Sequence, residues 1–465
     1  MASRTEHYAY SGFDVFGARE VNEWIDKNYW EEILPTVTPP SADQVMEFII
    51  PKTTKHMIDL GRTEFSFTFH VAKLNNEKMR IKVTDGVPVD ADTNEYATPI
   101  NLPFHTFWKQ IEILAGDGDE IISKTNDQNA YQAYIETILE TSAAEKQGWL
   151  KHYQMFHMDQ NAMDQVNPFN TDNINPGHNE RWKIVRNGDD ITVFGKLMND
   201  ICQQNRYILN GILLRIKIRP YPEAFRLVTS TNVANSAKIF LSKANLRLCK
   251  VVPKTSVLSG LSAGFDVSAA QYPIRKIDIR TREIPSGSLG PNFDNLFSGE
   301  IPSKMIVAFV QTTAFNGDYS LNPLYFHHMN MKSIKVYLNG EQTPDTSSYE
   351  CDFSKPNSNF LHLVAALNKW KYNDYKYFDS GITPEIFKNG CALFCFNLDP
   401  AVPTNMSIWP PPKTGTVKLD IIFGAATNRP YKMLLYSIFP GVIQVDSQRR
   451  ILPSNVSTAS AYAVK

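Results

Sequence analysis

Residues 260–264, with the sequence Gly-Leu-Ser-Ala-Gly, are the part of this chain that most resembles a catalytic motif. In hydrolases with the G-x-S-x-G pattern, the serine lies on a sharp strand-to-helix turn that presents its hydroxyl as a nucleophile. Here the flanking sequence, SVLSGLSAGFDVSAA, consists mainly of small residues and shows no clear helix after the serine. A short motif outside its structural context is weak support for catalysis, so we expect Ser262 to lie in a flexible surface loop.

The acidic sequence GDGDE, which contains Asp117, Asp119 and Glu120, is a candidate calcium site. A calcium loop needs more oxygen ligands at defined spacing and a closing glutamate. A solvated hairpin tip is therefore the favoured interpretation, since Gly and Asp are common turn residues. Asp189 and Asp190, in the polar sequence RNGDD, are likewise expected to be solvated loop residues.

Histidine pairs could indicate a metal site of the cupin type, but their spacing does not suit chelation. His327 and His328 are adjacent in a predicted strand, so their side chains point to opposite faces of that strand. His152 and His157 are five residues apart, which suits neither a helix nor a strand. The chain also lacks a GxxxxGK loop and a Gly-rich dinucleotide motif. We therefore expect no metal ion, no cofactor and no catalytic residue.

The five cysteines are Cys202, Cys249, Cys351, Cys391 and Cys395, and none forms a CxxC pair. The last two lie in an apolar run with strand character, where four residues span about 13 Å, too far for a disulfide. Free buried thiols in a reducing compartment are favoured. The N-terminal sequence MASRTEHYAYSG lacks the apolar core of a signal peptide, and no apolar run reaches the roughly 18 residues of a membrane span. We expect synthesis in the cytosol and no transmembrane segment.

The charge balance limits how the protein can interact with nucleic acid. The chain has 47 Lys and Arg and 48 Asp and Glu, a formal net charge of −1, and neither end carries a basic arm. Binding to a phosphate backbone requires a basic patch that displaces counterions. The alternating stripe Arg215, Lys217 and Arg219 is expected to be the solvated face of a strand. The charge balance therefore predicts at most weak contact between this protein and nucleic acid.

Strand signals dominate the chain. From Glu64 to Val71 phenylalanines alternate with polar residues, which predicts a half-buried antiparallel strand. Residues 214–219 and 417–423 alternate in the same way, and Asn339-Gly340 is the preferred pair for a tight hairpin turn. Helical signals are fewer. One helix is predicted from an apolar stripe at residues 131–139, with Gly148 as the residue that ends the helix. A second helix is predicted at residues 361–370. The stripe is interpreted as a core contact and consists of Tyr131, Tyr134, Ile135, Ile138 and Leu139.

The order of these elements repeats along the chain. FHTFWKQIEILAGDGDEI from Phe104 and FHHMNMKSIKVYLNGEQT from Phe326 both continue as an apolar alternating strand, end at a glycine turn and precede one of the two helices. Two such β-rich halves suit an eight-stranded jelly roll each, with inserted helices. The predicted fold is all-β, with two tandem eight-stranded jelly rolls. The predicted ranges are an N-terminal arm at 1–45, jelly rolls at 46–230 and 231–450, and a C-terminal tail at 451–465.

Seven segments in consistent order resemble the major capsid proteins of Polinton (Maverick) elements and the related adintoviruses. They span about residues 45 to 450, and together they are more specific than any one of them is alone. The segments are FIIPKTTKHMIDLGRTEFSF from Phe48, INLPFHTFWKQIEILAGDG from Ile100, NAYQAYIETILETSAAEKQGWL from Asn129, DICQQNRYILNGILLRIKIRP from Asp200, NPLYFHHMNMKSIKVYLNGEQTP from Asn322, DSGITPEIFKNGCALFCFNLDP from Asp379 and GTVKLDIIFGAATNRPYKMLLYSIFPGVIQVD from Gly415.

The resemblance implies a double jelly roll that forms homotrimers of pseudo-hexagonal outline, which tile an icosahedral capsid around double-stranded DNA. The implied partners are a single jelly-roll penton protein and minor cement proteins. The implied location is the virion capsid, with assembly in the host nucleus. The family has no catalytic residues to carry over. Within the predicted arm, the aromatic residues Trp24, Tyr29 and Trp30 are our hypothesis for contacts with neighbouring subunits.

Two other interpretations stay open at the level of sequence. Jelly rolls also occur in carbohydrate-binding and cupin-like proteins, so a two-domain protein of that kind is the alternative function. A host-encoded relative, descended from a transposon and no longer forming particles, would have the same sequence features.

Overall fold

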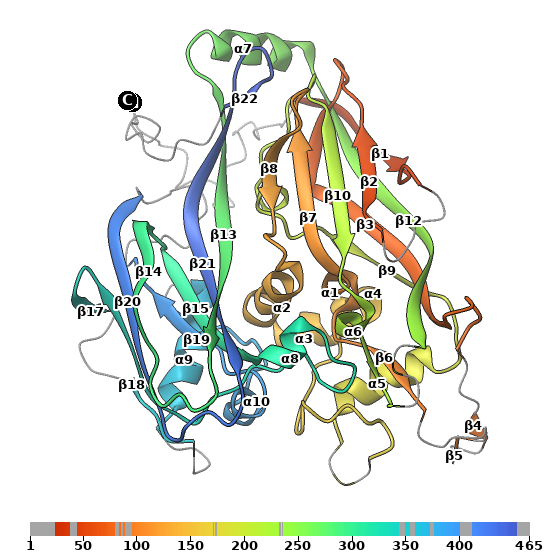
Figure 1. Ribbon diagram of the computed structural model, residues 1–465. Coiled ribbons are helices and arrows are strands. Elements are labelled where there is room, and N and C mark those ends of the chain that lie inside the picture. Colours follow the sequence, from red (N-terminus) through yellow and green to blue (C-terminus); the bar gives the residue numbers. More distant parts are fainter. Residues whose placement is uncertain are drawn as a thin grey trace, which may run out of the picture.

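The computed structural model consists of two β-sandwiches side by side, joined by a helix across one end (Figure 1). No helix among the described residues is both long and apolar enough to cross a membrane. The structure describes residues 24–37, 44–79, 83–84, 87–88, 95–170, 172, 174–231, 234, 236–343, 349–353, 359–372, 376–399 and 412–452.

The first half of the chain forms two four-stranded antiparallel sheets that pack face to face. One sheet has the order β1-β12-β3-β9, and the other has the order β2-β10-β7-β8. The long strands β3 and β12 pair along nearly their whole length. The bounds are β1 Ile25–Ile33, β2 Met46–Ile50, β3 Met57–Lys73, β7 Trp108–Ala115, β8 Glu120–Lys124, β9 Ile191–Lys196, β10 Leu214–Pro220 and β12 Ala237–Pro253.

The second half forms two sheets of the same kind. One has the order β13-β21-β15-β19 with β22 added to β21, and the other has the order β14-β20-β16-β17 with β18 added to β16. The bounds are β13 Ala270–Ile284, β14 Asn292–Ile301, β15 Lys304–Gln311, β16 Met331–Leu338, β17 Glu341–Thr343, β18 Tyr349–Glu350, β19 Phe394–Asn397, β20 Lys413–Phe423, β21 Tyr431–Val445 and β22 Ile451–Leu452.

The two halves have the same topology. If the eight sheet strands of each half are numbered in chain order, one sheet has the order 1-8-3-6 and the other has 2-7-4-5, in both halves. Two four-stranded antiparallel sheets linked in this way form a jelly roll. The predicted fold class, two tandem eight-stranded jelly rolls with inserted helices, is confirmed.

Strand pairing changes the bounds that the sequence predicted for the two jelly rolls. Ile25–Ile33 lies inside the predicted arm 1–45, yet it pairs with β12 as the first strand of the first jelly roll. Ala237–Pro253 follows the predicted boundary at 230, yet it is the last strand of that jelly roll. The first jelly roll therefore runs from β1 to β12 and the second from β13 to β22, whose residues Ile451–Leu452 lie inside the predicted tail 451–465. The separate folding of the two halves stays a prediction.

Most of the predicted strands and helices are confirmed. Phe65, Phe67 and Phe69 of β3 point into the sandwich and are buried. The alternating stretches at 214–219 and 417–423 form β10 and β20. Asn339 and Gly340 join β16 to β17 with positive φ angles of 50° and 90°, as a two-residue hairpin turn requires.

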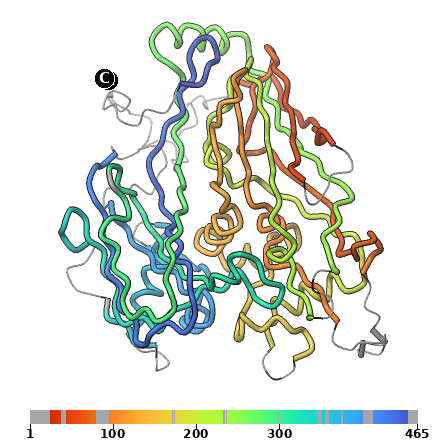
Figure 2. Tube along the Cα trace, viewed as in Figure 1, coloured from red at the N-terminus to blue at the C-terminus, as the bar shows by residue number. Residues whose placement is uncertain are grey.

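The helices lie mainly in the long connections at one end of the two sandwiches, opposite the end crossed by α7 (Figures 1 and 2). Helix α2 ends at Glu140, earlier than the predicted stop at Gly148, and two further short helices follow it. The bounds are α1 Pro103–Thr106, α2 Asn129–Glu140, α3 Ala143–Gln147, α4 Trp149–Tyr153, α5 Pro176–Val185, η1 Asp200–Gln203, α6 Glu223–Arg226, α7 Thr255–Phe265, α8 Thr312–Asn316, α9 Leu361–Lys369, η2 Trp370–Tyr372 and α10 Pro384–Lys388. The remaining short strands are β4 Val83–Thr84, β5 Val87–Pro88, β6 Ala97–Pro99 and β11 Leu227–Thr229.

Helix α2 joins the cores of the two halves. Tyr131 stacks on Phe315 of α8, with ring centroids 5.4 Å apart, and Tyr134 packs against Phe326 at 6.1 Å. Both tyrosines are fully buried, so the predicted core role of this apolar stripe is confirmed. The helix therefore fixes the second jelly roll against the first.

Candidate functional site

The three aromatic residues predicted as subunit contacts lie on or beside β1, an edge strand of its sheet. Trp24 precedes the strand and is 70% exposed, and Trp30 is 43% exposed with the Arg247 guanidinium 5.0 Å from its ring. The Tyr29 hydroxyl lies 2.8 Å from Nε2 of His56. The structure thus brings the three residues to one sheet edge, which has no strand partner on its outer side among the described residues.

The candidate nucleophile Ser262 lies in the middle of helix α7 and not in the loop that the sequence suggested. The helix has no fully buried residue, and the side chain of Ser262 faces solvent. A nucleophile elbow requires the serine on a tight turn beside an oxyanion hole. Neither feature is present around Ser262, and α7 serves as the connection between the two jelly rolls.

The acidic turn GDGDE joins β7 to β8 as a hairpin tip, and Asp117 and Asp119 of this turn form ion pairs. Lys52 Nζ lies 2.6 Å from a carboxylate oxygen of Asp117, and Arg215 donates to Asp119 at 2.9 Å. Lys217, next in the basic stripe, faces Glu47 at 3.9 Å. The stripe is thus the outer face of β10, where Arg215 and Lys217 pair with carboxylates and Arg219 is exposed.

The histidines singled out in the sequence take part in packing. His327 packs against Tyr325 and Tyr431, and His328 stacks on Phe353. Burial lowers the pKa of each of these imidazoles to about 4, which favours the neutral form. Among the residues that the structure describes, no three His, Cys, Asp or Glu side chains lie close enough to hold a metal ion.

Asp190 and His157 have structural roles that the sequence did not indicate. Asp190, expected in a solvated loop, pairs with His70 at 2.7 Å and with Lys78 at 3.1 Å, which lowers the pKa of its carboxyl. The carbonyl of His157 accepts hydrogen bonds from Asn101 and Arg181. His152 is exposed. All five cysteines are buried, and no two of them form a disulfide.

A polar cluster that no sequence pattern predicted lies between the two jelly rolls. Arg275 of β13 donates to both carboxylate oxygens of Glu140, at 3.0 and 3.3 Å, and also to Gln203 at 3.3 Å. Gln203 in turn donates to Glu136 at 2.8 Å, and the hydroxyl of Tyr436 in β21 lies 3.4 Å from the other oxygen of Glu136. We call Glu136, Glu140, Asp200 and Arg275 the inter-half cluster.

Burial changes the protonation of this cluster. Desolvation, followed by the charge of Glu140, raises the pKa of Glu136 to about 7. Desolvation and the neighbouring Glu136 also raise the pKa of Asp200 well above its usual value. Three carboxyl groups therefore lie near Arg275 at the contact between the halves. In two of them, Glu136 and Asp200, burial favours the neutral form.

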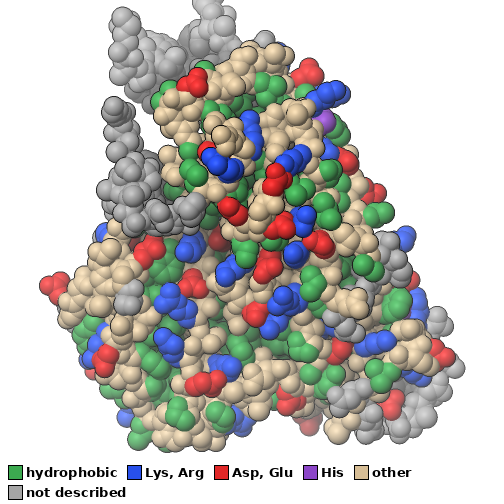
Figure 3. Space-filling view, turned by 45° about the horizontal axis from the view of Figure 1, so that its top comes forward, with side chains coloured by type: hydrophobic (Ala, Val, Ile, Leu, Met, Phe, Trp, Pro, Cys, Tyr) green, Lys and Arg blue, Asp and Glu red, His purple; other side chains and the backbone are tan. Residues whose placement is uncertain are grey.

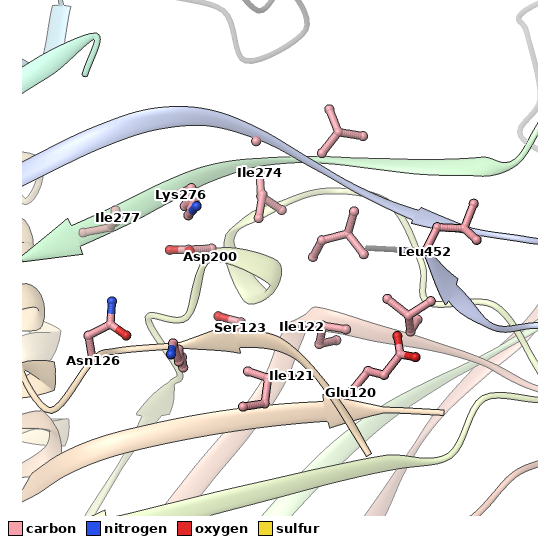
Figure 4. A pocket seen from close by; sticks show the side chains of 15 residues that line it. Glu120, Ile121, Ile122, Ser123, Asn126, Asp200, Ile274, Lys276, Ile277 and Leu452 are labelled. Carbon is pink, nitrogen blue, oxygen red and sulfur yellow. The ribbon is translucent and has the colours of Figure 1, made fainter. Parts of the chain in front are cut away.

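Beside this cluster, a groove of about 350 Å³ separates β8 of the first jelly roll from β13 of the second. Figure 4 shows Ile121 and Ile122 of β8 opposite Ile274 of β13, with Leu452 of β22 nearby. Asn126 closes the other end, where its amide donates to Asp278 at 3.3 Å. The groove is lined by the two facing edge strands, and it belongs to the contact between the halves.

A second cavity, of about 540 Å³, lies between α4 and β9 of the first jelly roll, beside the end of α2. We call it the α4–β9 pocket. Aromatic rings form one wall, and carboxylate and amide side chains line the rest. The lining includes Glu64, Glu136, Glu140, Trp149, Tyr153, Gln154, Phe194, Gly195, Lys196 and Asn205.

The surface in Figure 3 carries basic and acidic side chains interspersed over both halves, without a large area of one sign. This distribution agrees with the near-zero net charge of the chain. The face shown in Figure 3 therefore does not present the continuous basic patch by which proteins bind a nucleic-acid backbone.

Comparisons with known proteins connect this architecture to viral shells. A chain of the Sputnik virophage structure matches with a TM-score of 0.60 and 10% identity, covering 99% of this chain and 94% of that one. The Faustovirus major capsid protein matches at 0.53 and 8% identity, with 93% of both chains covered. The mavirus major capsid protein matches at 0.52 and 10% identity, covering 100% and 98%. The chain has the double jelly-roll fold of viral major capsid proteins.

Comparisons of the sequence alone do not identify a family for this chain. No family model matches the chain. An uncharacterized protein of Caenorhabditis elegans is 22% identical over 372 residues, which cover 78% of this chain and 82% of that protein. The structural likeness therefore rests on the fold, because identities near 10% carry no information about individual functional residues.

Proposed function

We propose that this protein is the major capsid protein of a double-stranded DNA virus or virus-like transposon, with a structural role and no enzymatic one. The observation that carries the proposal is the repeated jelly roll, which has the same strand order in both halves and is shared over nearly the whole chain with major capsid proteins. Two equivalent halves allow three copies to close a ring with six similar contacts. The protein forms such homotrimers, and these tile an icosahedral shell.

The finer parts of the proposal follow from the resemblance to Polinton and adintovirus capsid proteins. The trimers enclose double-stranded DNA with weak contact, meet a single jelly-roll penton protein and minor cement proteins, and assemble in the host nucleus into the virion capsid. The near-zero net charge and the mixed charges on the face in Figure 3 support a shell protein that encloses DNA without binding it strongly. A relative from an animal, Caenorhabditis elegans, supports a genetic element carried by animal hosts.

The contact between the two halves suggests how copies meet. Within the chain, the first jelly roll covers the edge of β13, where Arg206 donates to the Gln271 carbonyl at 2.6 Å and Asp200 accepts a hydrogen bond from the Ile277 backbone. Strand β1 is the equivalent of β13 in the first jelly roll, and its edge carries the exposed Trp24 and Trp30. By this pseudo-symmetry, the β17 side of the second jelly roll of one copy covers β1 of the next.

The oligomeric state of the purified protein tests the proposal. We expect size-exclusion chromatography with light scattering to give three times the chain mass of 52.8 kDa, and negative-stain images to show compact trimers or closed particles. A monomer that never assembles at any salt concentration or pH would contradict the proposal. It would favour the alternative, a two-domain carbohydrate-binding or cupin-like protein.

The edge of β1 gives a sharper prediction. Trp30→Glu is expected to convert trimers to monomers, because it places a charge in a contact that would otherwise be apolar. The far-UV circular dichroism spectrum should stay unchanged, since Trp30 is already partly exposed. A point substitution is preferred to removing the arm, because β1 is a strand of the sheet.

The matched control is Val267→Glu, at an exposed position just after α7 that belongs to neither edge strand. This variant should remain trimeric in light scattering. If Trp30→Glu also remains trimeric, the subunit contact does not involve β1.

A further inference from the structure

The α4–β9 pocket has the composition of a small-ligand site that the capsid role does not require. Trp149 and Tyr153 lie one helical turn apart on α4, so they face the same side, and they remain 44% and 46% exposed. The Tyr153 ring lies 4.6 Å from that of Phe194 in β9, which fixes the wall. Large aromatic side chains left exposed beside a cavity typically serve as contact surfaces.

The floor of the pocket holds a polar group without a partner. Gln154 is only 2% exposed, and its side-chain carbonyl oxygen makes no hydrogen bond to any described residue. The amide packs directly over Gly195 of β9, where a Cβ atom would collide with Nε2 of Gln154. A glycine inside a strand weakens the strand, and a buried carbonyl oxygen without a hydrogen-bond partner is energetically unfavourable. Both features place the amide at the floor of this cavity, where a ligand could satisfy it.

The charges around the pocket limit the class of ligand. Glu64 is paired with Arg247 at 3.0 Å and Glu140 with Arg275 at 3.0 Å, so a cationic ligand would have to displace existing partners. A phosphate or carboxylate ligand would lie among glutamates, with Lys196 as the one basic side chain of the lining. A purely apolar ligand would leave the buried carbonyl oxygen of Gln154 unsatisfied.

A neutral sugar ring fits these limits. A pyranose has an apolar face of C–H groups and a rim of hydroxyls that both donate and accept hydrogen bonds. We propose that the α4–β9 pocket binds one sugar ring of a neutral glycan, with its apolar face on Trp149 and Tyr153 and its hydroxyls on Gln154, Glu136 and Asn205. The volume of about 540 Å³ lies within the roughly 300–1,000 Å³ typical of small-ligand sites.

This inference does not depend on assembly, because every lining residue belongs to the first jelly roll of one chain. It is tested by saturation-transfer NMR on the full-length protein with the methyl glycosides of glucose, galactose, mannose and N-acetylglucosamine. We expect transfer from the protein to the ring protons of at least one glycoside, with millimolar affinity. Absence of transfer to all four glycosides would overturn the proposal.

Two variants connect binding to the pocket. Trp149→Ala removes the stacking surface and is expected to weaken binding at least about tenfold. Gln154→Leu keeps the volume but removes the hydrogen bonds and should also weaken binding. The matched control is Tyr377→Ala, which removes an exposed aromatic ring outside the pocket and should bind as the parent does.

The outcomes separate the ligand classes. Thermal unfolding of each variant confirms that the fold is intact. Glycoside binding that survives both Trp149→Ala and Gln154→Leu would overturn the proposed site. Binding of a lysine-rich peptide instead of the glycosides, with loss in Trp149→Ala, would replace the sugar with a basic protein partner.

Discussion

Replacing Asp159 with alanine is expected to lower the free energy of unfolding by about 3–5 kcal/mol, because it leaves Arg181 as a buried charge without its counter-ion. The two side chains are 2% and 3% exposed, and Arg181 donates to Asp159 at 3.0 and 3.5 Å. Removing one partner of a buried ion pair costs far more than the pair itself contributes. Urea unfolding followed by fluorescence measures the change.

The position of this ion pair explains why its loss should affect a whole region. Arg181 of α5 also donates to the carbonyls of Pro99 and His157, at 3.2 and 3.1 Å. It thereby joins three segments that are distant in sequence, at the loop-bearing end of the first jelly roll (Figure 1). Gly177 allows the close approach, since a Cβ atom there would lie 2.5 Å from the Met158 carbonyl.

Two controls accompany this prediction. Asp164→Ala changes an exposed aspartate in the same connection and is expected to alter stability by at most about 0.5 kcal/mol. Asp159→Asn keeps a hydrogen-bond acceptor for Arg181 and should lie between the other two variants. Equal stability of Asp159→Ala and the parent would show that Arg181 reaches solvent or another partner in solution.

The sequence predicted elements with a regular pattern and a buried face, and it missed those without one. Phe65, Phe67 and Phe69 alternate because one side of β3 faces the core, so the period of two was visible. Strand β1 lies at an edge with a bulge near its start, and much of it remains exposed. Its side chains do not alternate, and its presence in the sheet depends on pairing with β12, more than 200 residues later.

Helix α7 was missed for a different reason. Its sequence, TSVLSGLSAGF, contains two glycines and three serines, which have low intrinsic helix propensity. Leu258, Leu261 and Phe265 nevertheless pack against the first core, and Arg449 lies 4.7 Å from the Phe265 ring. Tertiary contacts at the junction of two long strands therefore decide the conformation, and no local pattern contains that information.

The functional candidates divide in the same way. Trp24 and Trp30 could be named from sequence because aromatic residues in a polar, proline-rich segment are conspicuous. The inter-half cluster could not, since Glu140 and Arg275 are 135 residues apart and belong to different jelly rolls. Gln154 belongs to no sequence motif. Its fixed position is evident only in the structure, where the absence of a Cβ atom at Gly195 leaves room for its side-chain amide.

The inter-half cluster makes the stability of the protein depend on pH. Glu136 has a pKa of about 7 in the folded chain, against an ordinary value of 4.5, because burial and the charge of Glu140 disfavour its ionised form. The folded state therefore binds this proton more tightly than the unfolded chain does. The stabilising contribution is complete below about pH 4.5 and is lost as the pH rises through about 7.

We therefore expect the thermal midpoint to be higher at pH 5.5 than at pH 8, with a difference in stability of up to roughly 2 kcal/mol from this one group. Glu136→Gln has no proton to lose and should flatten the profile between these values. The control Glu341→Gln, at an exposed position in β17, should keep the slope of the parent. A parent protein that is more stable at pH 8, or an unchanged slope in Glu136→Gln, would contradict this assignment.

The same ionisation acts on the contact between the two jelly rolls, because the groups around Glu136 come from both. Gln203 and Glu140 belong to the first half, whereas Arg275 and Tyr436 belong to the second. Ionisation of Glu136 adds a buried carboxylate beside Arg275, which already pairs with Glu140, and this favours separation of the halves and entry of water. Hydrogen exchange at β13 should therefore quicken between pH 6 and pH 8 beyond the intrinsic pH effect, and Glu136→Gln should abolish this excess.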